Sequence, residues 1–223
     1  MMVDLVIFDC DGVLIDSEVI SARMLIAELA GLGVSVDMAY VARHFLGRSY
    51  PTVMATIRKD FGLDLPPSFE EAYRTRLLAA FERELRVMPH VAEVLERLAL
   101  PFCVATSSSP RRAAISLRLV GLAGLVGDRL FTASEVVRGK PAPDLFLHAA
   151  ARMGADPARC LVIEDSLTGV RAGLAAGMEV WRFTGGSHLK GMAMEAPDDA
   201  RPQREFDSFA HFFQIDPATT GHP

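Results

Sequence analysis

Short apolar runs recur along most of the chain, and stretches with apolar residues at helical spacing lie between them. The runs are rich in β-branched and aromatic side chains, which is typical of buried strands. They span residues 5–8, 102–105, 129–132, 160–163 and 179–183. The helical stretches span residues 91–98, 110–120, 143–153 and 167–176. Strands that alternate with helices predict an α/β fold with a parallel sheet and right-handed crossovers.

The second part of the chain departs from this alternation, because residues 17–86 contain helical patterns only. Helices are predicted at residues 19–32, 38–45, 51–61 and 69–85, and the apolar face of the first carries Val19, Met24, Leu25, Leu29 and Leu32. An all-helical insertion after the first strand predicts a small cap domain of residues 17–86. The core domain would then consist of residues 1–16 and 87–223, with hinges near residues 16–18 and 83–89. The alternative is that these helices pack directly on the sheet.

The C-terminal part carries weaker signals. Residues 195–205 are polar and are interpreted as a surface loop, and residues 206–213 are interpreted as a last short helix. We expect the tail from Pro217 to be mobile, as chain ends without apolar anchors commonly are.

An abrupt change from apolar to acidic residues marks the end of the first predicted strand. Asp9 and Asp11 follow residues 5–8 directly, with Cys10 between them and Gly12 after them. Side chains at i and i+2 of an extended segment share a face, so both carboxylates can point into one crevice at the sheet's carboxyl edge. Two adjacent carboxylates repel each other, and a hard cation such as Mg²⁺ would relieve that repulsion. The alternative is a polar turn in which Asp11 has no chemical role.

Two other predicted strands also end in polar or acidic residues. These are Thr106 and Ser107 after the strand at 102–105, and Glu164 and Asp165 after the strand at 160–163. In a parallel sheet such ends meet at one edge, and Lys140, in a loop flanked by prolines, could supply a cation there. Taken singly, each polar pair could instead cap the next helix, and the lysine could be solvated.

Composition and charge narrow the possible partners and compartment. Half of the 223 residues are apolar and the net charge is −5, which gives no electrostatic case for nucleic acid or an anionic membrane. No apolar run approaches the roughly 18 residues of a membrane span, and the N-terminus lacks the pattern of a signal peptide. The cysteines Cys10, Cys103 and Cys160 lie in or beside apolar runs, which suits reduced thiols in a cytoplasmic protein. Carboxylates beside Cys10 disfavour a nucleophilic thiolate.

The stretch from residue 6 to residue 18 resembles the nucleophile motif of the haloacid dehalogenase superfamily, Asp-x-Asp-Gly-Val/Thr-Leu-x-Asp-Ser. Its end, Asp16-Ser17-Glu18, is similar to the β-phosphoglucomutase-type subgroup, which carries a helical cap. The order and spacing of the strand-end residues and of Lys140 match the four motifs of the superfamily. The resemblance implies a Rossmann-like core with a parallel sheet flanked by helices and an inserted helical cap.

The resemblance also implies roles for the residues at the strand ends. Asp9 would attack phosphorus and form an aspartyl-phosphate, and Asp11 would protonate the leaving oxygen and then activate water. Mg²⁺ would be held by the Asp9 side chain, the Asp11 carbonyl and the Asp165 side chain. Glu164 would be either a further ligand or a residue that contacts the ligands. The Thr106 hydroxyl and the Ser107 N–H would hold phosphoryl oxygens, and Lys140 would offset the repulsion between nucleophile and phosphate.

The same comparison separates related activities. Haloacid dehalogenases lack a second aspartate, so Asp11 argues against that activity, and nothing singles out Lys59, the one lysine of residues 17–86, as a phosphonatase Schiff base. Ser21 stands where β-phosphoglucomutase carries a cap histidine, which favours hydrolysis. We therefore expect a Mg²⁺-dependent phosphatase acting on a small phosphomonoester. A sugar phosphomutase and a catalytically silent binding protein are the alternatives.

The cap is expected to select the substrate. Arg48, in a glycine-bearing loop between two predicted cap helices, is the candidate for contacting a substrate anion, whereas His44 is expected to be structural or exposed. The stretch at residues 8–23, the region around Glu84-Leu85 and residues 177–180 also look like the bacterial 6-phosphogluconate phosphatase branch. This resemblance covers most of the chain and implies a phosphorylated sugar or sugar acid. The expected partner is this small molecule, with the chain acting as a monomer or weak homo-oligomer.

Overall fold

The computed structural model describes residues 3–45, 47–63, 65–66, 68–191 and 195–215. Within these residues the chain forms a parallel sheet of six strands in the order β3-β2-β1-β4-β5-β6. The strands are β1 (Leu5–Phe8), β2 (Phe102–Thr106), β3 (Leu130–Thr132), β4 (Cys160–Glu164), β5 (Glu179–Phe183) and β6 (Arg204–Phe206). The three central strands, β2, β1 and β4, are buried along their whole length, because helices cover both faces of the sheet.

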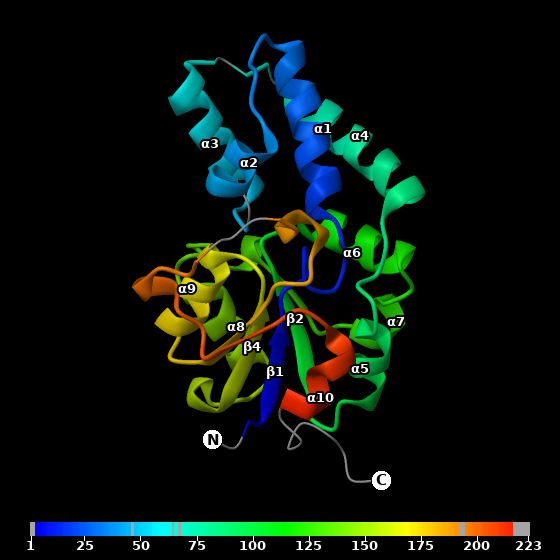
Figure 1. The fold of residues 1–223 in the computed structure, drawn as a ribbon, viewed down its shortest axis with the longest axis vertical. Coiled ribbons are helices and arrows are strands. Elements are labelled where there is room, and N and C mark those ends of the chain that lie inside the picture. Colours follow the sequence, from blue (N-terminus) through cyan, green and yellow to red (C-terminus); the bar gives the residue numbers. More distant parts are fainter. Residues whose placement is uncertain (1–2, 46, 64, 67, 192–194, 216–223) are drawn as a thin grey trace.

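Alternate residues of β1 point to the two faces of the sheet and into two separate clusters of apolar side chains. Val6 and Phe8 face α5 (Val91–Arg97), α6 (Pro110–Leu119), α7 (Ala123–Val126) and α10 (Phe212–Ile215). Leu5 and Ile7 face α8 (Asp144–Arg152) and α9 (Leu167–Ala175). Figure 1 shows α8 and α9 on one side of the strands and α5, α7 and α10 on the other. The α/β fold class and the Rossmann-like core are confirmed.

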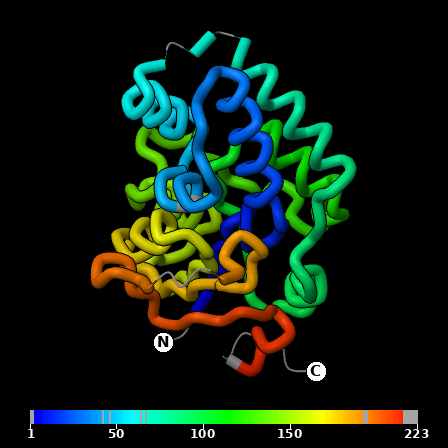
Figure 2. The backbone as a smooth tube through the Cα atoms, turned by 45° about the horizontal axis from the view of Figure 1, so that its top comes forward, coloured from blue at the N-terminus to red at the C-terminus, as the bar shows by residue number. Residues whose placement is uncertain are grey.

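Four helices lie beyond the carboxyl ends of the strands. They are α1 (Glu18–Gly31), α2 (Met38–His44), α3 (Tyr50–Phe61) and α4 (Ser68–Glu84). Figure 2, in which this end comes forward, shows them in front of the core. We call residues 17–86 the helical insertion; its division from the core as a separate domain stays a prediction.

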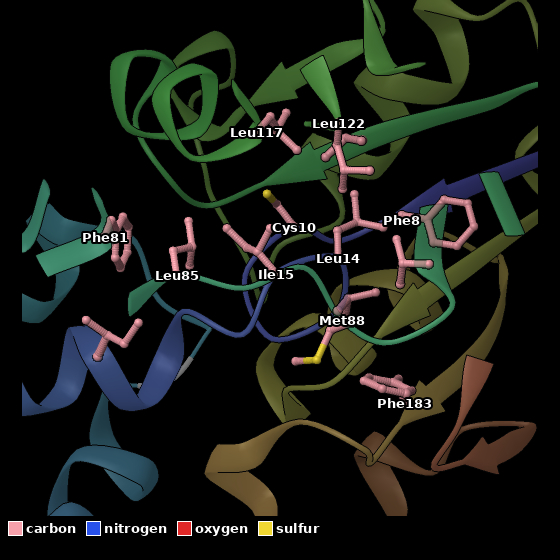
Figure 3. Close-up of a cluster of buried hydrophobic side chains, with 14 of the residues drawn as sticks. Phe8, Cys10, Leu14, Ile15, Phe81, Leu85, Met88, Leu117, Leu122 and Phe183 are labelled. Atoms are coloured by element: carbon pink, nitrogen blue, oxygen red, sulfur yellow. The ribbon is translucent and has the colours of Figure 1, made fainter. Parts of the chain in front are cut away.

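Two chain segments connect the helical insertion to the core, and they lie side by side. Ile15 and Val87 form an antiparallel bridge, the Met88 N–H donates to the Leu14 carbonyl over 2.9 Å, and the Asp16 N–H donates to the Arg86 carbonyl over 2.9 Å. Apolar side chains continue through this junction. In Figure 3, Phe81 and Leu85 at the end of α4 adjoin the junction residues Cys10, Leu14 and Ile15, followed by Leu117, Leu122 and Phe183 of the core.

The sequence-based boundaries agree with the structure to within a few residues, with three corrections. The predicted loop at 195–205 contains the first two residues of β6, and the predicted helix at 206–213 begins instead with the last residue of that strand. The short helix α7 was not predicted. Leu32, placed on the apolar face of α1, is 37 % exposed and follows the end of that helix. The tail from Pro217 lies outside the described residues.

Among the described residues, no helix combines the length and the apolar character needed to cross a membrane.

Candidate active site

The carboxyl ends of three neighbouring strands bring the predicted site residues together. Asp9 directly follows β1, Thr106 ends β2, and Glu164 ends β4. Phe8 pairs with Val104 on one side and with Ile163 on the other, so these three strands end at nearly the same level. A parallel sheet places its ligands at this edge.

Lys140 is a buried cation at this edge. Its Nζ donates hydrogen bonds to Asp9 Oδ1 over 2.5 Å, to Glu164 Oε1 over 2.7 Å and to the Ala105 carbonyl over 3.1 Å. Burial opposes the charge on this amine, but Asp9 and Glu164 outweigh that effect and hold the pKa of Lys140 above its usual value. The lysine is therefore charged, as the sequence-based role of Lys140 requires.

Three carboxylates surround one position beside Lys140. Asp9, Glu164 and Asp165 are buried, and each contributes an oxygen that lies within 4.8 Å of the other two. Burial raises the pKa of Asp9 well above its usual range; Lys140 opposes that rise, and the neighbouring carboxylates add to it. Burial and the adjacent Glu164 likewise raise the pKa of Asp165. Three carboxylates with one lysine leave excess negative charge on hard oxygen donors, and this donor set fits Mg²⁺.

Asp11 accepts hydrogen bonds on both carboxylate oxygens. Oδ1 accepts from Ser17 Oγ over 2.6 Å and from Arg112 Nη2 over 2.7 Å, and Oδ2 accepts from Ser108 Oγ over 2.6 Å and from Thr106 Oγ1 over 3.4 Å. Burial raises the pKa of this carboxyl, but Arg112 and the hydroxyl donors outweigh it, so the pKa of Asp11 lies below its ordinary value. In this arrangement Asp11 is an ionised acceptor, and proton donation requires a change of partners.

Ser107 connects the strand end to the helical insertion. Its hydroxyl donates to the Gly47 carbonyl over 3.2 Å, while the neighbouring Thr106 hydroxyl accepts from the Ser108 N–H over 3.1 Å. The end of β2 and the loop that follows it therefore contact Asp11 through Thr106 and Ser108, and contact the insertion through Ser107.

Two residues close to the carboxylates were given no role in the site from the sequence, although Glu18 belongs to the motif Asp16-Ser17-Glu18. His188 is 4 % exposed and its Nε2 lies 2.9 Å from Asp165 Oδ2; burial holds the pKa of His188 below its usual value, so the neutral ring donates to Asp165. Glu18 begins α1 and is partly buried. Burial, followed by the charge of Asp11, raises its pKa to about 7.

Arg112, Ser17 and Ser108 were also missed, although they provide three of the four contacts to Asp11. For Ser108 a signal existed, because it belongs to the run of serines that follows Thr106. Arg112 and His188 carried no local signal, because both contacts join residues far apart in the chain.

The strand ends open into a cavity of about 370 Å³ between the core and the helical insertion. Asp9, Asp11 and Thr106 line its base, and Arg48 lines it from the insertion; contact of Arg48 with a substrate stays a prediction. His44 packs against Tyr40, with ring centroids 4.4 Å apart, and does not line this cavity.

Cys10 is buried between the two aspartates and is not a nucleophile candidate. Burial, followed by the charges of Asp11 and Asp9, raises the pKa of its thiol well above the usual value. The three cysteines are free and buried, as the sequence predicts.

Comparison with known proteins identifies chains of similar sequence. The family model for haloacid dehalogenase-like hydrolases matches residues 3–177. The chain is 30 % identical over 189 residues to 6-phosphogluconate phosphatase of Escherichia coli, covering 84 % of this chain and 86 % of the relative. It is also 30 % identical over 217 residues to hexitol phosphatase A of the same organism, covering 92 % and 89 %.

Solved structures that resemble this chain belong to the same family. A haloacid dehalogenase-like protein from Agrobacterium tumefaciens superimposes with a TM-score of 0.80 at 31 % identity, covering 97 % of this chain and 98 % of the other. A hydrolase of the same family from Deinococcus radiodurans, solved with bound phosphate and sodium, has a TM-score of 0.74 at 36 % identity, covering 97 % and 96 %.

Proposed function

This chain belongs to the haloacid dehalogenase-like hydrolase family and is a phosphoric monoester hydrolase, and we propose that it dephosphorylates a small sugar phosphate or sugar-acid phosphate. The observation that carries the proposal is the buried group of Asp9, Lys140, Glu164 and Asp165, of which Asp9 lines the cavity. A phosphate dianion needs a nucleophile and compensating positive charge at one place, and this group offers both.

Asp9 is proposed as the nucleophile. It lies at the base of the cavity, where its carboxylate can reach the phosphorus of a bound ester, and it accepts a hydrogen bond from Lys140. Attack would form an aspartyl-phosphate and release the alcohol, and water would then hydrolyse this intermediate, splitting one difficult displacement into two. Lys140 would reduce the repulsion between the carboxylate and the phosphate, and the Thr106 hydroxyl and the Ser107 N–H would hold phosphoryl oxygens.

Asp11 is proposed as the acid that protonates the leaving oxygen and as the base that activates water afterwards. It lines the same cavity as Asp9. Its carboxylate would first have to leave the donors Ser17, Ser108 and Arg112, take up a proton from water once these donors no longer lower its pKa, and turn toward the ester oxygen.

Mg²⁺ is proposed as the cofactor, because the donor set of Asp9, Glu164 and Asp165 fits a hard divalent ion. The Asp9 and Asp165 side chains and the Asp11 carbonyl would hold it, with Glu164 as a further ligand or as a support of Asp165. When bound, the ion neutralises charge on the phosphoryl group. His188 would hold the Asp165 carboxylate in place through its 2.9 Å contact.

The helical insertion, residues 17–86, is proposed to act as a cap domain whose movement opens and closes the cavity. Both connections to the core run through the paired segments around Ile15 and Val87, so a small change there would move the whole insertion. Arg48 would contribute to substrate selection from this side. Among substrates, 6-phosphogluconate is our first candidate, because the 6-phosphogluconate phosphatase of Escherichia coli is similar over most of this chain.

The test is phosphate release from a panel of phosphorylated sugars and sugar acids, with Mg²⁺ or with EDTA, by the wild type and by Asp9→Asn. We expect release that needs Mg²⁺ and that falls by at least about 10³-fold in Asp9→Asn, since the nucleophile is lost. A folded wild type that releases no phosphate would refute the proposal. Isomerised sugar phosphate detected by NMR would then indicate a phosphomutase, and binding without turnover would indicate a silent binding protein.

A further inference from the structure

Arg112 joins the core to the helical insertion at the catalytic edge. It belongs to α6 of the core, and its Nη2 donates both to Asp11 Oδ1 over 2.7 Å and to Ser21 Oγ of α1 over 3.1 Å. Its guanidinium carbon lies 5.4 Å from the ring centroid of Phe81 in α4. This arginine therefore lies where the catalytic carboxylates meet the wall of the cavity.

The hydrogen bonding of Arg112 is incomplete in the described residues. Its Nε is buried and has no partner there, and the same is true of the Tyr50 hydroxyl; both side chains line the cavity. A buried donor that makes no hydrogen bond lowers the stability of the fold, and a ligand that supplies an acceptor relieves that cost.

The chemistry of a guanidinium identifies the acceptor. Its nitrogens form a planar fork that matches the two oxygens of a carboxylate, and a charged donor favours a charged acceptor. Asp11 uses only Nη2 of this fork. A carboxylate on the substrate can therefore bind Arg112 through two nitrogens and take the place of Asp11.

The spacing suits a short substrate. Asp9 and Asp11 are two residues apart, which corresponds to at most about 7 Å of extended backbone, and Arg112 lies one hydrogen bond beyond Asp11. A phosphate at Asp9 and a carboxylate at Arg112 would therefore be joined by a chain of a few carbons. Glu18 also faces Arg112, and with a pKa of about 7 it is largely uncharged in slightly acidic solution, where it does not repel a carboxylate.

We propose that Arg112 determines substrate specificity by binding a carboxylate at the end of the substrate remote from the phosphate. The enzyme would therefore prefer phosphorylated sugar acids over neutral sugar phosphates and alditol phosphates. This inference rests on the proposed phosphatase function and adds a second residue to Arg48, which lines the cavity from the insertion and is exposed. By displacing Asp11 from Arg112, the substrate carboxylate would also free Asp11 to turn toward the ester.

The test compares two esters that differ at one carbon: 6-phosphogluconate, which carries a carboxylate at C1, and glucitol 6-phosphate, which carries a neutral hydroxymethyl group there. Both are assayed at pH 6.5 with Mg²⁺, using the wild type, Arg112→Met, Arg112→Lys and the control Arg118→Met, an exposed arginine of the same helix that lies outside the cavity lining. The readout is the ratio of the two kcat/KM values, because loss of the Asp11 contact alone slows both esters alike.

We expect the wild type to prefer the gluconate and Arg112→Met to lower that preference by about 10- to 100-fold, the range for a lost charge-assisted contact. Arg112→Lys should keep part of the preference, and Arg118→Met should keep all of it. Equal loss on both esters, or a wild type without preference, would overturn the role of Arg112 while leaving the phosphatase intact. If the wild type hydrolysed neither ester, the proposed function and this inference would both fail. Melting curves identify variants that do not fold. If Arg112→Met does not fold, the ratio of the two kcat/KM values measured for Arg112→Lys is the test.

Discussion

Lys140 is the residue on which the charge balance of the site depends. It is 6 % exposed, and its ammonium group bridges two carboxylates, Asp9 and Glu164, while a third, Asp165, lies beside them. A buried ion pair is weak evidence for stability by itself, but removing one partner leaves an uncompensated charge and is costly. Stability and catalysis should therefore both depend on this single side chain.

Lys140→Met removes the positive charge and keeps an apolar stem of similar length. We expect the unfolding free energy to fall by about 3–5 kcal/mol in EDTA, and phosphate release to fall by about 10²–10³-fold. Mg²⁺ should restore part of the lost stability, since a divalent cation also compensates the carboxylates. Urea unfolding and phosphate release measure the two effects. Lys59→Met, an exposed lysine of α3, is the control, and unfolding curves identical for the two variants would contradict the prediction.

Glu18 should make the stability of the fold depend on pH. Burial raises the pKa of this carboxyl from 4.5 to about 7, so the folded chain holds a proton that the unfolded chain has already released. The stabilisation is complete below about pH 4.5 and is lost as the pH rises through about 7.

Glu18→Gln imitates the neutral carboxyl at every pH. In EDTA we expect its unfolding free energy to equal that of the wild type near pH 4.5 and to exceed it by about 2–3 kcal/mol at pH 8. Urea unfolding at several pH values measures this difference, with Glu96→Gln, an exposed glutamate of α5, as the control. A difference between Glu18→Gln and the wild type that does not change with pH would show that the Glu18 carboxyl is not held neutral.

Some residues of the site could be predicted from the sequence, and others could not, because their contacts join distant segments of the chain. Asp9, Thr106 and Glu164 each end or follow an apolar strand, and parallel strands bring their ends together without further information. Arg112 and His188 lie on a helix and in a short turn, and their contacts depend on how distant segments pack. No spacing rule along the chain marks such residues.

At the scale of elements, the approach of α9 to the end of β4 depends on one glycine. A Cβ built on Gly169, in the first turn of α9, would lie 1.7 Å from Glu164 Oε1. The same turn is closed by Ser166 Oγ, which accepts from the Gly169 N–H over 3.0 Å, while Glu164 Oε2 accepts from the Ser166 N–H over 2.8 Å. The glycine therefore makes room for the carboxylate that meets Lys140.

Gly169→Ala should displace Glu164 and weaken its contact with Lys140. We expect the unfolding free energy to fall by about 1–3 kcal/mol, as for overpacking of a filled interior. Gly31→Ala is the matched control, because that position in α1 has no heavy atom within 4 Å of the added carbon, and there we expect a gain of about 0.5–1 kcal/mol. Urea unfolding compares the two, and equal stability of both variants would contradict the close packing of α9 on Glu164.

The elements that the sequence failed to predict are the short ones at the periphery. β6 is three residues long at the edge of the sheet, and two of its residues, Arg204 and Glu205, are exposed, so it has no apolar run. The helix α7 spans four residues, too few to show a helical period. The central strands and longer helices were predictable because burial on one or both sides imposes a pattern long enough to recognise.

At the scale of the whole molecule, the helical insertion meets the core at the paired connections and again across the cavity. Besides Arg112, one contact across the cavity is at Gly47, in the loop between α2 and α3. Its carbonyl accepts from the Ser107 hydroxyl, and a Cβ built on it would lie 2.2 Å from Ser166 Oγ. With these contacts and those of Arg112 in place the insertion covers the strand ends.

Gly47→Ala tests whether this approach matters for turnover. The added carbon would hold the insertion away from Ser166, so the two sides of the cavity would no longer reach the geometry seen here. Because a displacement of about 1 Å in a catalytic arrangement can cost about 10²-fold in rate, we expect kcat/KM for a sugar phosphate to fall by about 10- to 100-fold. The unfolding free energy should fall only by the backbone strain of an alanine at positive φ, about 1–2 kcal/mol, since the contact with Ser166 lies between the insertion and the core and not within either.

Gly62→Ala provides the matched control for Gly47→Ala, because the two glycines share a positive φ, +70° at Gly47 and +61° at Gly62, and only Gly47 has close neighbours. Backbone strain from the alanine is therefore present in both variants, and the clash with the core is present in one. Steady-state kinetics and urea unfolding on the pair separate the two causes. If both variants lost activity equally, strain alone would explain the loss. If Gly47→Ala lost activity selectively while the two variants were equally stable, turnover would require the insertion to approach the core at Ser166.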